Sequence, residues 1–193
     1  MFRGVMRRSA HSLRHVVAGL CIALLAACAT VPAPAPSGAS FELTGRVAVR
    51  SGADAASARF TWQHSPSFDD LMISTPLGQG VAEITRRADQ YTLLTADSRR
   101  ISAADPETLT EQALGWRLPL AGLPDWVQGR PYPHAQDETR YGRDGRPEVM
   151  RQLGWTIEYL AYDERAGLPS RLRLTRDGVD IRLTIDSWAE APQ

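Results

Sequence analysis

Residues 41–50 read Phe41-Glu42-Leu43-Thr44-Gly45-Arg46-Val47-Ala48-Val49-Arg50, with an apolar or small side chain at every odd position and mostly polar ones between. Successive side chains of a β-strand point to opposite faces, so a period of two gives one wet face and one dry face. The stretch therefore predicts a strand of an antiparallel sheet that packs on one side only.

The same period recurs along the rest of the chain. Further alternating stretches lie at 58–63, 71–75, about 81–87, 90–95, 155–160, 172–174 and 179–185. Asp177-Gly178 and Asp144-Gly145 are dipeptides typical of two-residue hairpin turns. Many short strands with hairpin connections predict a mainly β domain.

One interval between these stretches has a helical pattern. Asp105-Pro106-Glu107 offers an N-cap, a first-turn proline and a first-turn acid, and Gly115 offers a stop, so we expect a short helix at about 105–114. Residues 118–129 add leucines and a tryptophan, but their prolines cannot sit inside a helix, which favours one or two short helical pieces. The sheet is thus expected to be strongly curved or to form an incomplete antiparallel barrel capped by short helices. A sandwich with a packed core stays open, because periodicity does not separate the two.

The N-terminal residues 1–27 are typical of a secretory signal. Four arginines and no acid precede an apolar run at 16–27, which is too short and wrongly flanked for a membrane span. The run ends in Leu25-Ala26-Ala27-Cys28, which resembles a bacterial lipobox, and the resemblance implies that Cys28 is acylated and becomes the mature N-terminus. An ordinary secretion signal with a chance cysteine is the alternative.

Residues 28–40 form the predicted tether, and residues 41–193 the folded domain. The tether is rich in alanine and proline and cannot bury a core face. Ala29, rather than an aspartate, follows Cys28, which favours the periplasmic face of the outer membrane over retention in the inner membrane. We expect a lipid-anchored protein at that face, acting as a monomer.

Composition excludes several classes of function. Without the four signal arginines the chain has 18 basic and 22 acidic side chains, a net charge of −4 that argues against a nucleic-acid partner. Cys21 and Cys28 are the two cysteines, so no disulfide or thiolate metal site is expected in the domain. His64 and His134 lack metal-ligand spacing, and no Gly-x-Ser-x-Gly turn occurs. We therefore expect neither enzyme activity nor a cofactor or metal.

Thr75-Pro76-Leu77-Gly78 has the composition of a β-turn, with proline second and glycine fourth. The turn holds Leu77 at its tip, where a polar residue is usual. Leu77 either enters lipid, gaining roughly 1.5–3 kcal/mol if fully buried, or folds back onto the sheet.

An ordered series of motifs extends from Phe41 to Trp188. It comprises Leu43-Thr44-Gly45-Arg46-Val47-Ala48-Val49, Ala58-Arg59-Phe60-Thr61-Trp62-Gln63, Pro76-Leu77-Gly78, Leu118-Pro119-Leu120, Trp126-Val127-Gln128-Gly129 with Pro131, and Ile181-Arg182-Leu183-Thr184-Ile185-Asp186-Ser187-Trp188. In order and spacing this series resembles the outer-membrane lipoprotein receptor family LolB. The resemblance implies a half-open barrel around an apolar cavity, which takes acylated lipoproteins from the periplasmic carrier LolA and inserts them into outer-membrane lipid without a nucleotide.

The resemblance also implies that the loop Pro76, Leu77 and Gly78 inserts cargo into the membrane, and Pro124 departs from the family pattern where it could split a lid helix. Dry-face residues are candidates for the acyl-chain cavity: Val47, Val49, Phe60, Trp62, Leu71, Ile73, Leu93, Trp155, Ile157, Leu172, Leu174, Ile181 and Leu183. Each could equally be core. A structural or assembly lipoprotein that binds a protein through a sheet edge is the alternative function.

Overall fold

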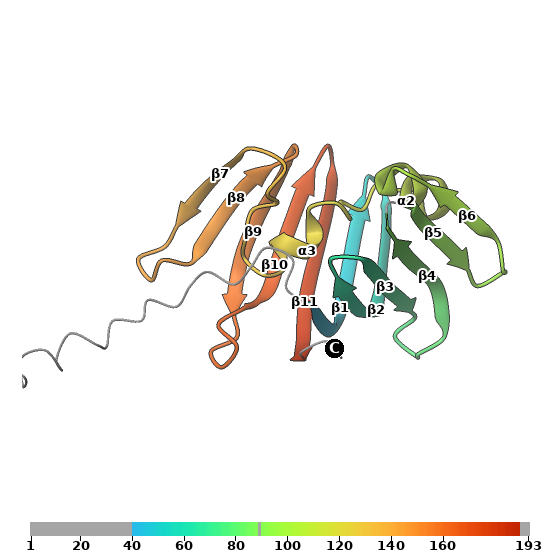
Figure 1. Cartoon of the computed structure of the whole chain (residues 1–193), viewed down its shortest axis with the longest axis horizontal. Helices are drawn as coiled ribbons and strands as arrows, with labels where there is room; N and C mark the ends of the chain where they lie inside the picture. The colour runs from blue at the N-terminus through green and yellow to red at the C-terminus, as the bar shows by residue number, and fades with distance from the viewer. Residues whose placement is uncertain (1–39, 89, 190–193) are drawn as a thin grey trace, which may run out of the picture. The chain divides into compact units, whose positions relative to one another are not determined.

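Strands dominate residues 40–88 and 90–189, the part of the chain that the computed structural model describes (Figure 1). The predicted signal, Cys28 and nearly all of the predicted tether lie outside these residues. The strands are β1 (Phe41–Ser51), β2 (Asp54–Ser65), β3 (Phe68–Ser74), β4 (Gly80–Arg87), β5 (Gln90–Thr95), β6 (Arg100–Ala103), β7 (Asp137–Tyr141), β8 (Pro147–Gln152), β9 (Trp155–Tyr162), β10 (Pro169–Arg176) and β11 (Val179–Ala189).

All of these strands belong to one antiparallel sheet with the order β6-β5-β4-β3-β2-β1-β11-β10-β9-β8-β7. The first and last strands pair at its centre, where Val47 lies opposite Leu183. β6 and β7 form the two free edges, so the sheet does not close. This confirms the predicted half-open, mainly β fold and excludes the sandwich for the described residues.

The sheet order dictates the path of residues 104–136. These residues connect β6 to β7, which follow one another in sequence but lie at opposite edges. The connection must therefore cross the sheet, and it does so over the apolar face (Figure 1). We call residues 104–136 the crossing segment. It holds α2 (Pro106–Leu114), which packs on β5 and β6, and α3 (Leu123–Trp126).

Both helices follow from local sequence. The Asp105 carboxylate accepts hydrogen bonds from the backbone N–H groups of Glu107 and Thr108, and Gly115 ends α2 in the left-handed conformation, at φ 82°. The predicted helix at about 105–114 is thus confirmed. In α3, Pro124 occupies the first turn, where its missing N–H costs nothing. Pro124 is the second residue of this short helix, and the rest of the crossing segment from Leu118 onward is turn or irregular.

The two predicted hairpin dipeptides also form turns. Asp177 and Gly178 both have positive φ, 49° and 81°, as a type I′ connection between β10 and β11 requires. Asp144-Gly145 connects β7 to β8. Neither of these two strands was expected from its own alternation.

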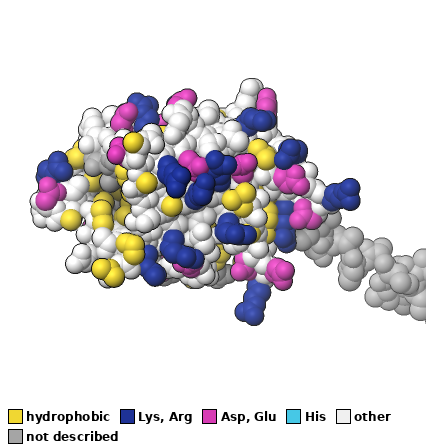
Figure 2. Space-filling view, turned by 180° about the vertical axis from the view of Figure 1, so that it is seen from behind, with side chains coloured by type: hydrophobic (Ala, Val, Ile, Leu, Met, Phe, Trp, Pro, Cys, Tyr) yellow, Lys and Arg dark blue, Asp and Glu magenta, His cyan; other side chains and the backbone are white. Residues whose placement is uncertain are grey.

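The two faces of the sheet differ in chemistry. Figure 2 shows arginine and acidic side chains interspersed over the face opposite the crossing segment. Cross-strand ion pairs lie there, such as Arg46 with Asp186 at 2.8 Å and Arg173 with Asp180 at 2.9 Å. The other face carries the buried apolar side chains. The period of two therefore separates a solvated face from a dry one, as predicted.

Gly45 interrupts the apolar side of β1 for a steric reason. A Cβ at this position would lie 2.4 Å from the carbonyl oxygen of Thr184 and 2.9 Å from the Phe60 ring. The β1–β11 register also shifts between Thr44 and Gly45. Glycine here lets Phe60 lie flat against the centre of the sheet.

Candidate functional site

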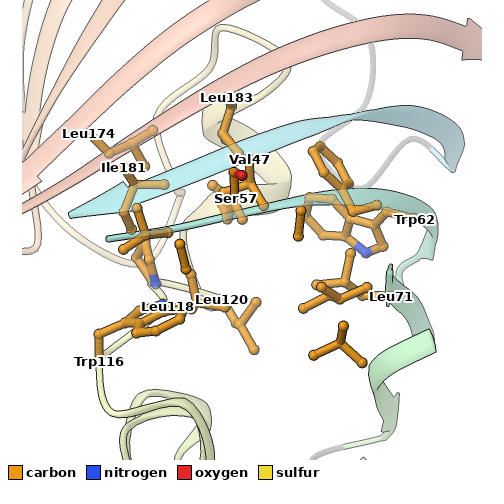
Figure 3. A pocket seen from close by; sticks show the side chains of 18 of the residues that line it. Val47, Ser57, Trp62, Leu71, Trp116, Leu118, Leu120, Leu174, Ile181 and Leu183 are labelled. Carbon is orange, nitrogen blue, oxygen red and sulfur yellow. The ribbon is translucent and has the colours of Figure 1, made fainter. Parts of the chain in front are cut away.

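An apolar cavity of about 160 Å³ lies between the central strands and the crossing segment (Figure 3). Its lining carries no charged side chain, and most of it is aliphatic or aromatic. The lining residues are Val47, Val49, Ala56, Ser57, Ala58, Phe60, Trp62, Leu71, Ile73, Thr75, Val81, Trp116, Leu118, Pro119, Leu120, Leu123, Val127, Leu174, Ile181 and Leu183.

The cavity lining contains most of the dry-face residues singled out from the sequence. Those that line it are Val47, Val49, Phe60, Trp62, Leu71, Ile73, Leu174, Ile181 and Leu183. The structure places the remaining candidates, Leu93, Trp155, Ile157 and Leu172, in the packed core and outside this cavity. Leu93 on β5 and the two β9 residues lie nearer the edges of the sheet, where α2 packs on β5 and the Arg176 guanidinium stacks over the Trp155 ring. Leu172 shares β10 with Leu174, which lines the cavity.

Sequence reasoning missed the other wall of the cavity. The crossing segment supplies Trp116, Leu118, Pro119, Leu120, Leu123 and Val127. Their apolar character was visible in the sequence. The direction in which these side chains point could not be predicted, because a segment of turns has no hydrophobic period that identifies a buried face.

The cavity reaches solvent at one end. Among its lining residues Ala56, Ser57 and Val81 are exposed, and Val47, Ala58, Ile73, Thr75 and Trp116 are half-buried. We call Ala56, Ser57, Thr75, Val81 and Trp116 the rim. Trp62, which is 3% exposed, lies at the inner end.

The β3–β4 loop stands beside this rim. The Gly78 N–H donates to the Thr75 carbonyl at 2.8 Å, which closes the predicted β-turn, and Gly78 adopts a φ of 87°. Leu77 at the tip is 92% exposed, so it does not fold back onto the sheet. Thr75 and Val81 on either side of the loop line the cavity. An exposed leucine therefore lies next to the opening of an apolar cavity.

The crossing segment is firmly attached on its α3 side. The Trp126 indole N–H donates to Gln152 Oε1 at 2.7 Å, and the Tyr159 hydroxyl donates to the Trp126 carbonyl at 3.1 Å. Burial raises the pKa of Tyr159, which keeps this hydroxyl protonated as a donor. Gly122 permits the close packing, since a Cβ there would lie 2.4 Å from the Trp126 ring. Residues 119–123, in contrast, are bonded locally, for example from the Leu120 N–H to the Leu118 carbonyl at 2.8 Å.

The chemistry of the lining suits an apolar ligand such as a hydrocarbon chain. Apolar cavities of about 150 Å³ stay dry and accept ring-sized apolar molecules. Within residues 40–88 and 90–189, no cluster of three or more histidine, cysteine or acidic side chains could hold a metal ion. None of the helices in the same residues is both long and apolar enough to cross a bilayer.

Comparison with protein families gives a match to the family described as outer membrane lipoprotein LolB over residues 39–188, nearly the whole described domain. The chain belongs to the LolB family. Its relatives include outer-membrane lipoprotein LolB of Thiobacillus denitrificans, 41% identical over 92% of this chain and 97% of the relative. Another is LolB of Pseudomonas fluorescens strain Pf0-1, 34% identical over 91% of this chain and 96% of the relative. Membership of the LolB family makes the chain a lipid-anchored outer-membrane protein of the lipoprotein localisation pathway.

Solved structures support the fold. A LolA superfamily protein from Nitrosomonas europaea superposes with a TM-score of 0.50 at 10% identity, covering 81% of this chain and 88% of that one. A DUF1329 family protein from Desulfovibrio piger gives a TM-score of 0.53 at 7% identity, over 80% of this chain and 87% of that one. At such identities the likeness concerns the arrangement of strands and helices.

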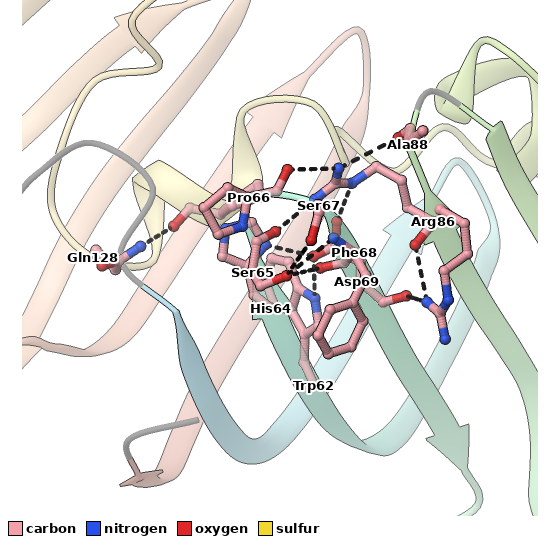
Figure 4. Close-up of polar contacts among 12 residues, drawn as sticks. Trp62, His64, Ser65, Pro66, Ser67, Phe68, Asp69, Arg86, Ala88 and Gln128 are labelled. Atoms are coloured by element: carbon pink, nitrogen blue, oxygen red, sulfur yellow. Dashed lines mark hydrogen bonds and ion pairs between the residues drawn. The ribbon is translucent and has the colours of Figure 1, made fainter. Parts of the chain in front are cut away.

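A buried polar network supports the inner end of the LolB-family cavity (Figure 4). The Trp62 indole N–H donates to Asp69 Oδ1 at 2.9 Å, and His64 Nδ1 lies 2.6 Å from the same oxygen. The Arg86 guanidinium pairs with the other carboxylate oxygen and donates to the Ser65 carbonyl at 2.8 Å. Asp69 thus fixes the Trp62 ring in the cavity wall.

The charge of Asp69 is stabilised in the folded state. Burial raises the pKa of the Asp69 carboxyl, but the hydrogen bonds and charges of His64 and Arg86 outweigh burial and hold the pKa below its ordinary value. A lowered pKa contributes stability above the ordinary pKa of about 3.9, and this contribution is lost as pH falls through the folded-state pKa.

Asp69→Asn is expected to lower the free energy of unfolding by about 3 kcal/mol at pH 7, because it leaves the Arg86 charge without its partner. The difference between wild type and variant should shrink as the pH falls below about 4. Denaturant titrations at several pH values measure both effects. Asp97→Asn is the control, because the Asp97–Arg99 pair is exposed and should contribute almost nothing. A difference that does not change with pH would contradict the assignment.

Proposed function

We propose that this protein receives acylated lipoproteins from a soluble periplasmic carrier of the LolA type and inserts them into the outer membrane. The acyl chains occupy the cavity under the crossing segment, and the Leu77 loop contacts the bilayer. No nucleotide and no catalytic step is needed. The observation that carries the proposal is the apolar cavity whose rim adjoins the exposed Leu77, in a chain of the LolB family.

The cavity answers an energetic requirement of the cargo. Three acyl chains of about fifteen methylenes each cost on the order of 30–40 kcal/mol to expose to water, at about 0.8 kcal/mol per methylene. Free passage through the periplasm is therefore negligible, and the chains must move by contact from one sheltered site to the next. For net flow, the receptor binds the chains more tightly than the carrier and less tightly than the bilayer.

Occupation of the cavity requires the crossing segment to move. The cavity of about 160 Å³ is too small for three long chains. Residues 119–123 are the part that opens in this proposal, since they are bonded locally, while Leu118 is held on α2 by Thr110 and Trp126 is held on the sheet by Gln152 and Tyr159. The apolar side chains that line the cavity would then change partners from one another to the acyl chains.

Leu77→Glu is expected to leave cargo binding intact and to slow delivery into liposomes roughly ten- to hundredfold, because a charged tip forfeits the 1.5–3 kcal/mol that a buried leucine gains in lipid. The measurement is incorporation of an acylated lipoprotein into liposomes from the preformed complex. Leu160→Glu is the matched control, since Leu160 is 55% exposed on β9, away from the loop. Delivery by Leu77→Glu at the wild-type rate would exclude this role for the loop.

Val47→Trp is expected to fill the cavity and reduce the amount of lipoprotein bound at least severalfold. Val47 projects from the centre of β1 into the cavity (Figure 3), so an indole there takes the volume of a chain. Ala48→Trp places the same side chain on the exposed face of the same strand and should bind cargo normally. Co-purification of lipoprotein with each variant gives the comparison, and equal binding by both would disprove occupation of the cavity.

Cys28→Ala is expected to release the protein from the membrane, because Cys28 is the proposed site of acylation. Membrane fractionation after expression provides the measurement, with the unmodified chain as the reference. Retention of the Cys28→Ala protein in the outer-membrane fraction would mean that another part of the chain forms the anchor.

A further inference from the structure

Two tryptophans line the cavity, and the indole N–H of only one of them has a hydrogen-bond partner among the described residues. The N–H of Trp62 has a partner, Asp69, at 2.9 Å. Nε1 of Trp116 is shielded from solvent and has no hydrogen-bond partner among residues 40–88 and 90–189. A buried donor without a partner is unfavourable and rare in folded proteins, so the Trp116 N–H calls for an explanation.

The backbone on both sides of Trp116 is attached to α2. The Gly115 N–H donates to the Glu111 carbonyl at 3.0 Å, and the Leu118 N–H donates to Thr110 Oγ1 at 2.9 Å. Arg117 between them pairs with Glu111 at 2.9 Å. The backbone around the indole is therefore held in place on α2.

The position of Trp116 suggests what its donor meets. Trp116 belongs to the rim, and Figure 3 shows its ring beside Leu118 at the edge of the cavity. The folded part of a lipoprotein cargo stays outside the cavity, so the acyl chains enter with their methyl ends first. Their ester or amide heads then remain at the rim. The carbonyl oxygens of those heads are hydrogen-bond acceptors, whereas the rest of each chain has none.

We propose that the Trp116 indole N–H donates a hydrogen bond to a carbonyl oxygen at the head of a bound acyl chain. The inference rests on the proposed function and deepens it: Trp116 distinguishes the acylated head of a chain from plain hydrocarbon and sets how deeply the chain enters. The carbonyl reaches the indole when the crossing segment opens, and it accepts a hydrogen bond from a donor that has no partner among residues 40–88 and 90–189.

Trp155 provides an internal comparison. Its Nε1 is also buried without a partner in the described part of the chain, but Trp155 does not line the cavity, and its ring faces the Arg176 guanidinium. An unpaired indole N–H therefore does not by itself indicate a ligand. The combination of an unpaired donor with a place on the cavity rim distinguishes Trp116.

The test compares two probes that differ in the acceptor: methyl nonanoate, which carries an ester carbonyl, and a straight-chain alkane of equal length, which carries none. The full chain with Cys28→Ala is used, so that no acyl anchor competes for the cavity. Trp116→Phe keeps an aromatic ring and removes the N–H. It should bind the ester about three- to tenfold more weakly than the parent and the alkane about equally well. Trp155→Phe is the matched control and should bind both probes like the parent.

The indole resonances of the parent protein supply a second measurement that does not depend on a folded variant. Addition of the ester should move the resonance of the Trp116 indole proton downfield, as a new hydrogen bond does. Addition of the alkane should move this resonance far less. Equal loss of both probes in Trp116→Phe, or no downfield shift with the ester, would overturn the inference. Failure of the parent protein to bind either probe would instead count against the proposed function.

Discussion

Pairing of the first strand with the last at the centre of the sheet is the constraint on which the rest of this structure depends. The β1–β11 ladder leaves β6 and β7 at opposite edges, although they are neighbours in sequence. The connection between them has to cross a whole face of the sheet, and the apolar face is the one that needs cover. The strand order alone therefore requires that the crossing segment cover the dry face, whatever its side chains are.

The crossing segment packs closely on one part of the sheet and loosely on another, and the cavity lies under the loosely packed part. Toward the β7 edge, Trp126, Gln152 and Tyr159 bond the crossing segment to the sheet, and the side chains beneath are packed as a core. Over the central strands, the turns around Pro119 carry no such bonds to the sheet among the described residues, and a cavity remains. Close packing is the normal state of a protein interior, so an apolar void lowers the free energy of unfolding. Function can be the reason that such a void is kept. Transfer of hydrocarbon chains is a use that requires imperfect packing, because a filled core could not accept them.

Polar groups lie at the borders of this cavity and give it two different ends. At the inner end Asp69, held by His64 and Arg86, satisfies the Trp62 indole and makes that wall rigid. At the rim the Trp116 donor has no partner among the described residues, and Leu77 is exposed nearby. The closed, satisfied end suits the methyl ends of acyl chains. The open end combines one spare donor with an apolar loop, which suits their polar heads and the membrane surface.

The sequence by itself determined the features that depend on local chemistry. The period of two in residues 41–50 predicted strands with one dry face, and Asp105-Pro106-Glu107 with Gly115 predicted α2. Thr75-Pro76-Leu77-Gly78 predicted the turn with Leu77 at its tip, but not whether Leu77 is exposed. Only the tertiary structure decided which dry residues face the cavity, as Val47 does, and which are packed core, as Ile157 is. Alternation assigns a side chain to one face of the sheet. The residues that pack on that face belong to the crossing segment, whose sequence has no hydrophobic period, so the contacts could not be predicted. The unpaired donor of Trp116 belongs to the same class, because a missing partner can be recognised only when every possible partner has been placed in space.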